Sequence, residues 1–297
     1  MERLRVGLVG GGPWARLVHG PALAAHPDVE FAAVWARRPE VTAELAAQFG
    51  THAVADPDEL FADVDVVAFA VPPQAQGELA VRAAAAGRHL ICEKPLADTL
   101  DAARAVAAAV ERAGVLSSMV LTLRHDPDVQ KWLADIPTAT AGIDTVGSAR
   151  WLSGALLGGP FATSPWRGEH GALLDIGPHV IDLLDAALGP VSEVEWVHRG
   201  EPDLTRFGLL HAGGARSTSV ISLRMPIDPS EIEFTVFGGA GRHRLAERSA
   251  DARGCFTRLV DELVAAVRGT GPAPALDAAH GLRLQEVVEQ VRVLGRG

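Results

Sequence analysis

The stretch LRVGLVGGGPWA, residues 4–15, decides the fold of this chain. Its first six residues are a short, mostly apolar run, as expected of a parallel strand buried on both faces. The next six fit the pattern G-x-G-x-x-G/A, in which glycines make a tight turn and let the backbone approach a pyrophosphate. A flexible turn is the alternative, but the helix expected at 14–25 and the strand expected at 29–35 favour dinucleotide binding. The residues predicted to contact the dinucleotide here are Gly10, Gly12, Pro13, Trp14 and Ala15.

Pro21 lies inside the helix expected at 14–25. An interior proline removes a backbone donor and clashes with the preceding turn, at a cost of about 3 kcal/mol. The sequence therefore predicts a kink near His19.

Strands and helices continue to alternate after this opening. Further strands are expected at 52–55, 64–71, 89–92 and 116–121, and further helices at 77–86 and 99–113. The last helix has Asp98 or Thr99 as its N-cap and Gly114 as its stop. Six strands with intervening helices predict an α/β domain over residues 1–122, with a doubly wound parallel sheet of the Rossmann type in the order 3-2-1-4-5-6.

The end of the second strand indicates which dinucleotide is bound. An NAD-binding sheet usually places an acid there, which binds the ribose 2′-hydroxyl. This chain has Ala36-Arg37-Arg38 instead, with no carboxylate to repel a 2′-phosphate and two guanidiniums that can bind it. The alternative is that these arginines are merely solvated. The missing acid favours NADP(H) over NAD(H), with Arg37 and Arg38 as cofactor-binding residues.

Ligands of such sheets bind beyond the carboxyl ends of the strands. Besides the glycine loop, two segments are expected at this edge, namely 71–74, which contains Pro72, and Glu93-Lys94-Pro95. Lys94 follows the fifth strand and is predicted to point toward the nicotinamide. The alternative is a surface cation paired with Glu93. Pro95 is a candidate for a cis peptide bond.

Beyond residue 122 the pattern changes to strands joined by short turns. Strands are expected at 145–152, 191–198, 205–211, 216–224, 231–237 and 242–246, and two terminal helices at 256–268 and 276–294. Consecutive strands without crossover helices indicate a largely antiparallel sheet. The sequence thus predicts a second, α+β domain over residues 123–297.

Asp175 and His179 are candidate catalytic residues of this second domain, at D-x-x-x-H spacing. Pro178 suits a first helical position, so a helix is expected at 178–188 with His179 in its first turn. The positive end of a helix disfavours an imidazolium, and a neutral imidazole can act as a general base. Asp175, just outside the helix, is placed to orient the ring. The alternatives are a capping Asp with a structural His, and a metal site that also uses His170.

Composition and charge argue against several functions. The net charge of -10 disfavours a nucleic-acid partner, which needs clustered cations. No run approaches the roughly 20 apolar residues that cross a bilayer, and the N-terminus lacks the regions of a signal peptide, so a cytoplasmic protein is expected. Cys92 and Cys255 form no C-x-x-C pair and are expected to be small buried hydrophobes. The chain has no tyrosine, which excludes a tyrosyl proton donor, and its only lysines are Lys94 and Lys131.

Together these residues resemble the glucose-fructose oxidoreductase and inositol dehydrogenase family, Gfo/Idh/MocA, over nearly the whole length. The resemblance rests on the glycine motif at 10–15, Glu93-Lys94-Pro95, Arg124 with Pro127, Asp175 and His179. It implies a Rossmann domain joined to an open-faced mixed sheet, with the active site in the cleft between them. It also implies that Lys94 lies near the nicotinamide and the substrate oxygen, that His179 moves the proton and that Asp175 assists it. Self-association as a dimer or tetramer through the second sheet is implied too.

The sequence departs from the family pattern at two places. Gln76, counted among the cofactor-binding residues, stands where a histidine is common, and Gly168-Glu169-His170-Gly171 replaces a usual glycine triplet. The chain is also shorter than many relatives. The resulting hypothesis is hydride transfer between NADP(H) and a sugar, keto sugar or polyol-like small molecule, preferably the reduction of a keto sugar, without a metal. The alternative is a non-catalytic NADP-binding sensor or regulatory protein on the same fold.

Overall fold

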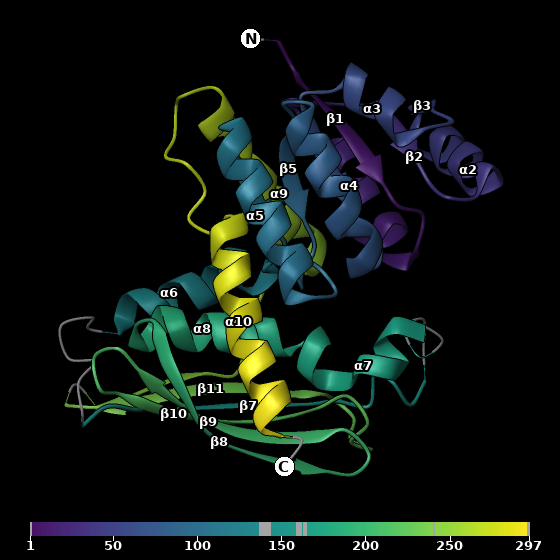
Figure 1. Ribbon diagram of the computed structural model, residues 1–297. Coiled ribbons are helices and arrows are strands. Elements are labelled where there is room, and N and C mark those ends of the chain that lie inside the picture. The colour runs from purple at the N-terminus through teal and green to yellow at the C-terminus, as the bar shows by residue number, and fades with distance from the viewer. Residues whose placement is uncertain (1, 137–143, 159–161, 163–164, 240, 296–297) are drawn as a thin grey trace. The chain divides into compact units, whose positions relative to one another are not determined.

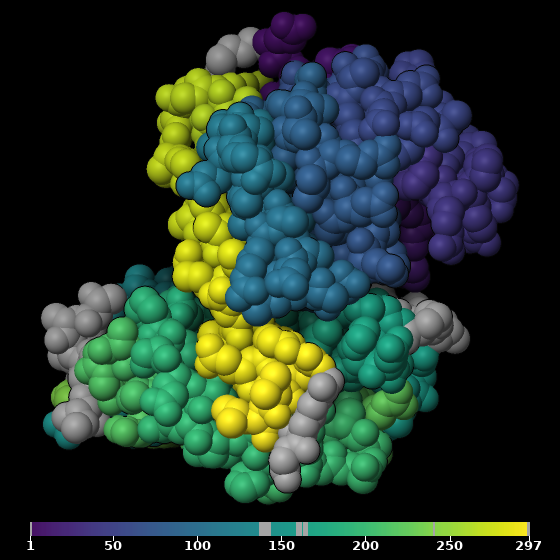
Figure 2. All heavy atoms as spheres, in the orientation of Figure 1, coloured from purple at the N-terminus to yellow at the C-terminus, as the bar shows by residue number. Residues whose placement is uncertain are grey.

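The chain folds into two compact units in the computed structural model (Figure 1), which describes residues 2–136, 144–158, 162, 165–239 and 241–295. One unit holds the residues up to His125 together with Asp251–Arg283, and the other holds Asp126–Ala250 together with the residues from Leu284 on. Residues 251–283, which the sequence assigned to the second domain, are thus part of the unit that contains the N-terminus. Their yellow-green side chains form part of that unit's surface in Figure 2.

The first unit is built on a wholly parallel sheet of six strands in the order β3-β2-β1-β4-β5-β6. The strands are β1 (Leu4–Val9), β2 (Val29–Trp35), β3 (His52–Ala53), β4 (Val66–Phe69), β5 (His89–Cys92) and β6 (Ser117–Met119). The predicted strand order is confirmed. Strands β3, β4 and β6 are shorter than predicted, and β4 starts late because Val64 caps the preceding helix.

Pro21 shapes the segment that follows the glycine loop. Instead of one kinked helix, the chain forms a π-helix, η1 (Ala15–His19), and then α1 (Gly20–Ala25). A proline cannot donate to the helical ladder, and a π-helical turn is one way in which a helix absorbs such an interruption. The irregularity predicted near His19 is confirmed, in the form of a widened turn.

The crossover helices begin and end at the residues that their sequences favour. They are α2 (Pro39–Phe49), α3 (Pro57–Asp63), α4 (Pro73–Ala85) and α5 (Leu100–Ala113). Helix α4 starts at a proline, whose missing N–H costs nothing in the first turn, and therefore starts earlier than the predicted residue 77. The Thr99 hydroxyl accepts a hydrogen bond from Ala102 N at 3.2 Å, and Gly114 ends α5 with φ of 64°, as predicted.

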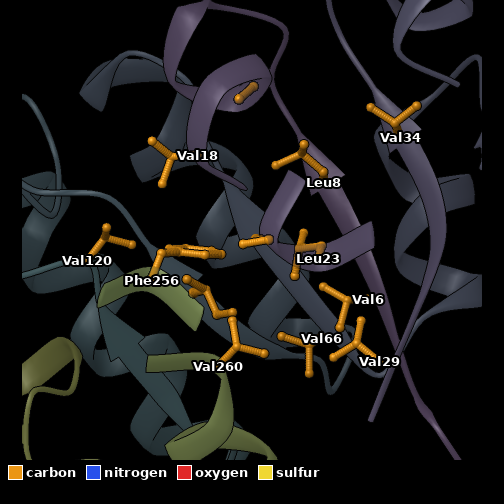
Figure 3. Close-up of a cluster of buried hydrophobic side chains, with 14 of the residues drawn as sticks. Val6, Leu8, Val18, Leu23, Val29, Val34, Val66, Val120, Phe256 and Val260 are labelled. Atoms are coloured by element: carbon orange, nitrogen blue, oxygen red, sulfur yellow. The ribbon is translucent and has the colours of Figure 1, made fainter. Parts of the chain in front are cut away.

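Helix α9 (Ala252–Val267) packs into the core of the first unit, although it follows the second sheet in the chain. Its apolar face carries Phe256, Leu259, Val260, Leu263 and Val264, all at most 4% exposed. These side chains lie in one buried cluster with Val18, Leu23 and Val66 (Figure 3). Helical periodicity predicts that such a face is buried but not which surface it is buried against. This packing is why residues 251–283 belong to the first unit.

The second unit is built on a sheet of six strands in the order β12-β11-β7-β10-β9-β8. The strands are β7 (Val146–Leu152), β8 (Val191–Gly200), β9 (Leu204–His211), β10 (Arg216–Ser222), β11 (Glu231–Gly238) and β12 (Gly241–Leu245). Among the strand pairs that the structure describes in this sheet, only the β7–β10 pair is parallel, and the others are antiparallel. The prediction of six strands in a largely antiparallel sheet is confirmed.

Helices α6 (Pro127–Asp135), α7 (Pro165–Asp175) and α8 (Gly177–Leu188) belong to the second unit, with α7 and α8 packed on its central strands. The short 3-10 helix η2 (Thr122–His125) belongs to the first unit, and α10 (Ala278–Leu294) contributes residues to both. Helix α8 ends at Gly189, as predicted. Among the described residues, no helix combines the length and the apolar character that crossing a bilayer requires.

Candidate active site

The glycine loop between β1 and η1 has the shape that a dinucleotide phosphate needs. Gly10 has φ of 135°, and a side chain there would collide with the carbonyl oxygen of Ala70, so only glycine fits this turn. A Cβ built on Gly12 would meet no atom within 4 Å, so the space beside its backbone is open. Next to them, Pro13 is exposed, Trp14 half-buried and Ala15 buried. The two glycines therefore fit the tight turn and the close backbone approach that the motif predicts.

Arg37 and Arg38 lie on an exposed turn directly after β2. The Thr42 hydroxyl fixes this turn. Its Oγ1 accepts a hydrogen bond from Ala36 N at 2.9 Å and donates one to Ala36 O at 3.1 Å. The Arg38 guanidinium is 3.9 Å from Glu40, and both side chains are about two-thirds exposed, at 71% and 66%. The turn thus presents cations to solvent at the end of the strand where the cofactor ribose is expected.

Gln76 holds the backbone around Lys94, a role that the sequence did not reveal. Its side chain is fully buried, and its Nε2 donates to Glu93 O at 2.7 Å and to Leu96 O at 2.9 Å. Its Oε1 accepts from Glu93 N at 2.8 Å. A single amide therefore bonds to the turn on both sides of Lys94. Spacing gives no hint of this, because the partners are 17 and 20 residues away.

Lys94 is half-buried in this turn, and its peptide bond to Pro95 is cis, as the sequence suggested. The carboxylate of the preceding Glu93 bonds to a histidine of the helix after the glycine loop, with His19 Nε2 2.9 Å from Oε1. Pro72, the other proline of this edge, is exposed and caps α4. The first unit thus brings Glu93, Lys94 and Pro95 together on one turn, which hydrogen bonds from α4 and η1 hold in place.

Cys92, which ends β5, is not a nucleophile of this site. The thiol is completely buried, and this burial together with the nearby charge of Glu93 raises the pKa of Cys92 to about 12. We expect iodoacetamide at about pH 8 to leave Cys92 unmodified in the native protein and to alkylate it promptly in guanidinium, where a thiol pKa is about 8.5. Peptide mass spectrometry reads both states. Rapid alkylation of native Cys92 would show that the thiol is accessible and would contradict this placement.

Asp175 and His179 lie at the junction of α7 and α8 in the second unit. Asp175 lies just outside α8, as predicted, and is the last residue of α7, a helix that the sequence did not predict. Its Oδ2 accepts a hydrogen bond from Arg167 Nε at 2.9 Å. His179 is in the first turn of α8, as predicted, and is 7% exposed. Its ring stacks on Trp151, with centroids 5.9 Å apart and planes 30° apart.

Arg167 and Trp151 are residues of this site that the sequence analysis missed. Arg167 precedes Asp175 by eight residues, and Gly171 interrupts the helix between them with φ of 62° and ψ of -159°. The bend makes spacing along a regular helix a poor guide to this pair. Trp151 is the sixth residue of β7, and only its tertiary packing reveals the contact with His179. Nothing in the D-x-x-x-H segment itself indicates that Arg167 or Trp151 contacts it.

A polar pocket of about 340 Å³ lies beside the first half of α7. It is lined by Gly168–Leu173, by the β8–β9 turn from Arg199 to Thr205, and by Arg224. The Asp203 carboxylate anchors this turn, because it accepts hydrogen bonds from Ser222 Oγ at 2.5 Å and Leu223 N at 3.0 Å. The segment Glu169-His170, which departs from the family pattern, thus forms part of a pocket wall.

The metal alternative gains no support from the described parts of the chain. Within them, no three His, Cys, Asp or Glu side chains are grouped closely enough to hold a metal ion. The ring of His170 instead lies beside that of Trp166, with centroids 5.9 Å apart. Both cysteines are buried.

Comparison with known proteins identifies relatives of the chain. Residues 4–121 match the family model of an oxidoreductase family with an NAD-binding Rossmann fold. A levoglucosan dehydrogenase of Pseudarthrobacter phenanthrenivorans is 33% identical over 66% of the chain, which spans only about half, 54%, of that relative's length. A dTDP-3,4-didehydro-2,6-dideoxy-alpha-D-glucose 3-reductase of Streptomyces antibioticus is 29% identical over 99% of the chain and 98% of its own length.

Solved structures share the whole fold. GenD2 from gentamicin A biosynthesis, in complex with NAD, has a TM-score of 0.85 over 100% of the chain and 95% of its own, at 23% identity. The WlbA dehydrogenase of Bordetella pertussis, in complex with NADH and UDP-GlcNAcA, has a TM-score of 0.86 over 99% and 97%, at 22% identity. The chain therefore shares its fold with these two structures.

Proposed function

Because the chain belongs to the Gfo/Idh/MocA family of oxidoreductases, we propose that it transfers a hydride between a nicotinamide dinucleotide and a carbon bearing a hydroxyl or carbonyl group. The proposed substrate is a sugar, keto sugar or polyol, and the proposed direction is reduction of the keto form. Relatives named as a levoglucosan dehydrogenase, a D-glucoside 3-dehydrogenase and a deoxyglucose 3-reductase support a sugar.

One observation carries the proposal: the chain combines a dinucleotide-type glycine loop with groups suited to proton transfer. The φ of 135° at Gly10 and the open space beside Gly12 support the binding of a pyrophosphate by this loop. Lys94 lies on a turn held by a buried glutamine, and His179 lies in the first turn of a helix. A protein that only bound the dinucleotide would have no need of groups placed for proton transfer.

The proposed chemistry uses three side chains, those of Lys94, Asp175 and His179. In reduction, the Lys94 ammonium donates a hydrogen bond to the substrate carbonyl oxygen and stabilises the negative charge that develops there. His179 donates the proton that the new hydroxyl requires, and it accepts that proton in oxidation. Asp175, held by Arg167, assists the imidazole. A bound dinucleotide would supply or accept the hydride at its nicotinamide ring.

A hydride-transfer assay tests this function. The purified protein is incubated with NADP(H) or NAD(H) and a panel of sugars, polyols and keto sugars, and absorbance at the reduced-nicotinamide band is followed. Turnover of at least one panel member is expected. If the dinucleotide binds while no member changes the absorbance, the enzyme proposal fails and a sensor or regulatory role takes its place.

We propose NADP(H) as the preferred cofactor, because Arg37 and Arg38 stand where an acid would select NAD(H). Arg37→Asp removes one cation and adds a charge that repels a 2′-phosphate, so it is expected to weaken NADPH binding about tenfold, as the loss of one charge-assisted hydrogen bond does. NADH binding should change little. Fluorescence titration measures both affinities. The control Arg112→Asp makes the same charge change at an exposed position late in α5, and equal losses for the two dinucleotides would contradict the proposal.

Two further features of the chain bear on the substrate and on assembly. The lining of the pocket beside α7 includes several polar side chains, among them Glu169, His170 and Arg224, which suits the hydroxyl groups of a sugar, and we assign this pocket to the substrate. We also propose that the second sheet is the surface for self-association. Its strands β7, β8 and β11 expose Val146, Trp196 and Phe237, and the first and last of these are partners in the sheet register. A cytoplasmic location stays a prediction.

A further inference from the structure

We propose that His19 is a positioning residue for Lys94, which it holds through the side chain of Glu93. The inference rests on the proposed function, in which Lys94 is a catalytic residue, and it adds a group that lies outside the D-x-x-x-H and Glu-Lys-Pro segments. The sequence marks His19 only as the place of a kink.

The contact between His19 and Glu93 is buried and directional. The His19 side chain is 0% exposed and that of Glu93 is 13% exposed, with Nε2 2.9 Å from Oε1. A carboxylate can only accept, so Nε2 carries the proton of this bond. On its other side the imidazole packs on Phe256 of α9, with ring centroids 4.1 Å apart. The ring is therefore held between a carboxylate and a buried phenyl group and has little freedom to move.

The two ends of Glu93 are held by different elements. Gln76 binds the backbone N–H and the carbonyl oxygen of Glu93, as described above. The hydrogen bond that the structure describes for the Glu93 carboxylate is the one to His19. Loss of His19 would leave a mostly buried carboxylate without this donor, and such a group is stabilised by moving toward solvent or toward another cation. Either movement would disturb the residue that follows it, Lys94.

The position of His19 in the chain gives this contact a second consequence. His19 ends the π-helix that begins at Ala15, the last residue of the glycine motif. The segment that follows the dinucleotide loop thus supplies the donor that holds the turn of Lys94. A displacement of the glycine loop and a displacement of Lys94 are therefore coupled through one hydrogen bond.

The scarcity of lysine allows a direct test. In a Lys131→Arg background Lys94 is the only lysine, so reductive methylation with ¹³C-formaldehyde labels its amine and the N-terminal amine alone. The variants are His19→Gln, which keeps an N–H donor at similar reach, and His19→Leu, which keeps the volume without a donor. The control is His26→Leu, since His26 is 5% exposed and its Nε2 is 3.0 Å from Asp261, which makes it a buried histidine paired with a carboxylate outside the Lys94 turn.

The expected result separates positioning from general stability. His19→Leu should shift or broaden the Lys94 signal and lower kcat about 10²-fold, the loss typical of a catalytic group misplaced by about 1 Å. The KM for the dinucleotide should change far less than kcat. His19→Gln should restore the signal and most of the rate, and His26→Leu should alter neither. Glu93→Ala should reproduce His19→Leu, and the double variant should be no worse than either single variant.

Different results overturn different statements. An unchanged Lys94 signal in His19→Leu, or an equal effect of His26→Leu, overturns the positioning role. If His19→Leu does not fold, a wild-type signal and rate in Glu93→Ala overturn it instead. If the unmodified protein turns over no sugar while His19→Leu still changes the Lys94 signal, the proposed function fails and the link from His19 to Lys94 stands.

Discussion

Replacing Lys94 by alanine is expected to lower kcat/KM for the sugar about 10²- to 10³-fold, the loss that follows removal of one donor to a developing oxyanion. Dinucleotide affinity should stay within a few-fold of the original, because the glycine loop is untouched. Lys94→Arg should recover little, since a planar guanidinium does not replace a compact ammonium on a constrained turn. Steady-state kinetics with the substrate found by the hydride-transfer assay, together with NADPH titration, measures both quantities.

The chain offers a matched control for this experiment. Lys131, its other lysine, lies on α6 with 74% of its side chain exposed and pairs with Asp135 four residues later at 2.5 Å. Lys131→Ala should leave kcat/KM unchanged, because exposed pairs of this kind contribute little even to stability. A Lys94→Ala protein that keeps its activity, or a Lys131→Ala protein that loses it equally, would remove Lys94 from the proposed chemistry.

His179→Asn is expected to lower kcat about 10²- to 10⁴-fold, the range that general acid–base catalysis contributes. Asparagine keeps a polar group in the first turn of α8 but cannot exchange a proton near neutral pH. The residual rate should lose the pH dependence that His179 gives the unmodified enzyme. Rates measured across the pH range with saturating dinucleotide test both statements.

An exposed histidine of the same unit serves as the comparison for His179. His198 lies on β8, where its ring is 5.4 Å from that of Trp196. His198→Asn should change neither the rate nor its pH profile. Should His179→Asn keep the original profile at a uniformly lower rate, the side chain would be a packing partner of Trp151 and not the group that moves the proton.

Local patterns were sufficient to predict the strands of both sheets and the strand order of the first. Strand β1, the glycine loop and the cap of α5 all depend on neighbouring residues, so the order of the first sheet followed from the sequence. In the second unit, short turns without crossover helices indicated a largely antiparallel sheet. The first turn of α8, with Pro178 and His179, was predicted for the same reason, since caps and helix starts are local.

Contacts between distant residues could not be predicted in this way. Gln76 has the spacing of an ordinary helical residue, and only the folded sheet brings its amide to the backbone around Lys94. The bond between His19 and Glu93 joins residues 74 positions apart. The packing of α9 could not be predicted for a similar reason, because its apolar face is equally suited to several surfaces. Side-chain type shows that a group needs a partner, whereas topology decides which partner it meets.

Helix α9 completes the core of a domain whose sheet ends some 130 residues earlier in the chain, between Met119 and Ala252. During translation, Val18 and Leu23 emerge from the ribosome long before Phe256 exists to cover them. A nascent chain at that stage exposes an apolar surface that chaperones recognise, and it cannot complete the core of its N-terminal domain before Phe256 has been synthesised. Synthesis of this protein should therefore depend more on co-translational protection than that of a domain whose core is made from one continuous segment.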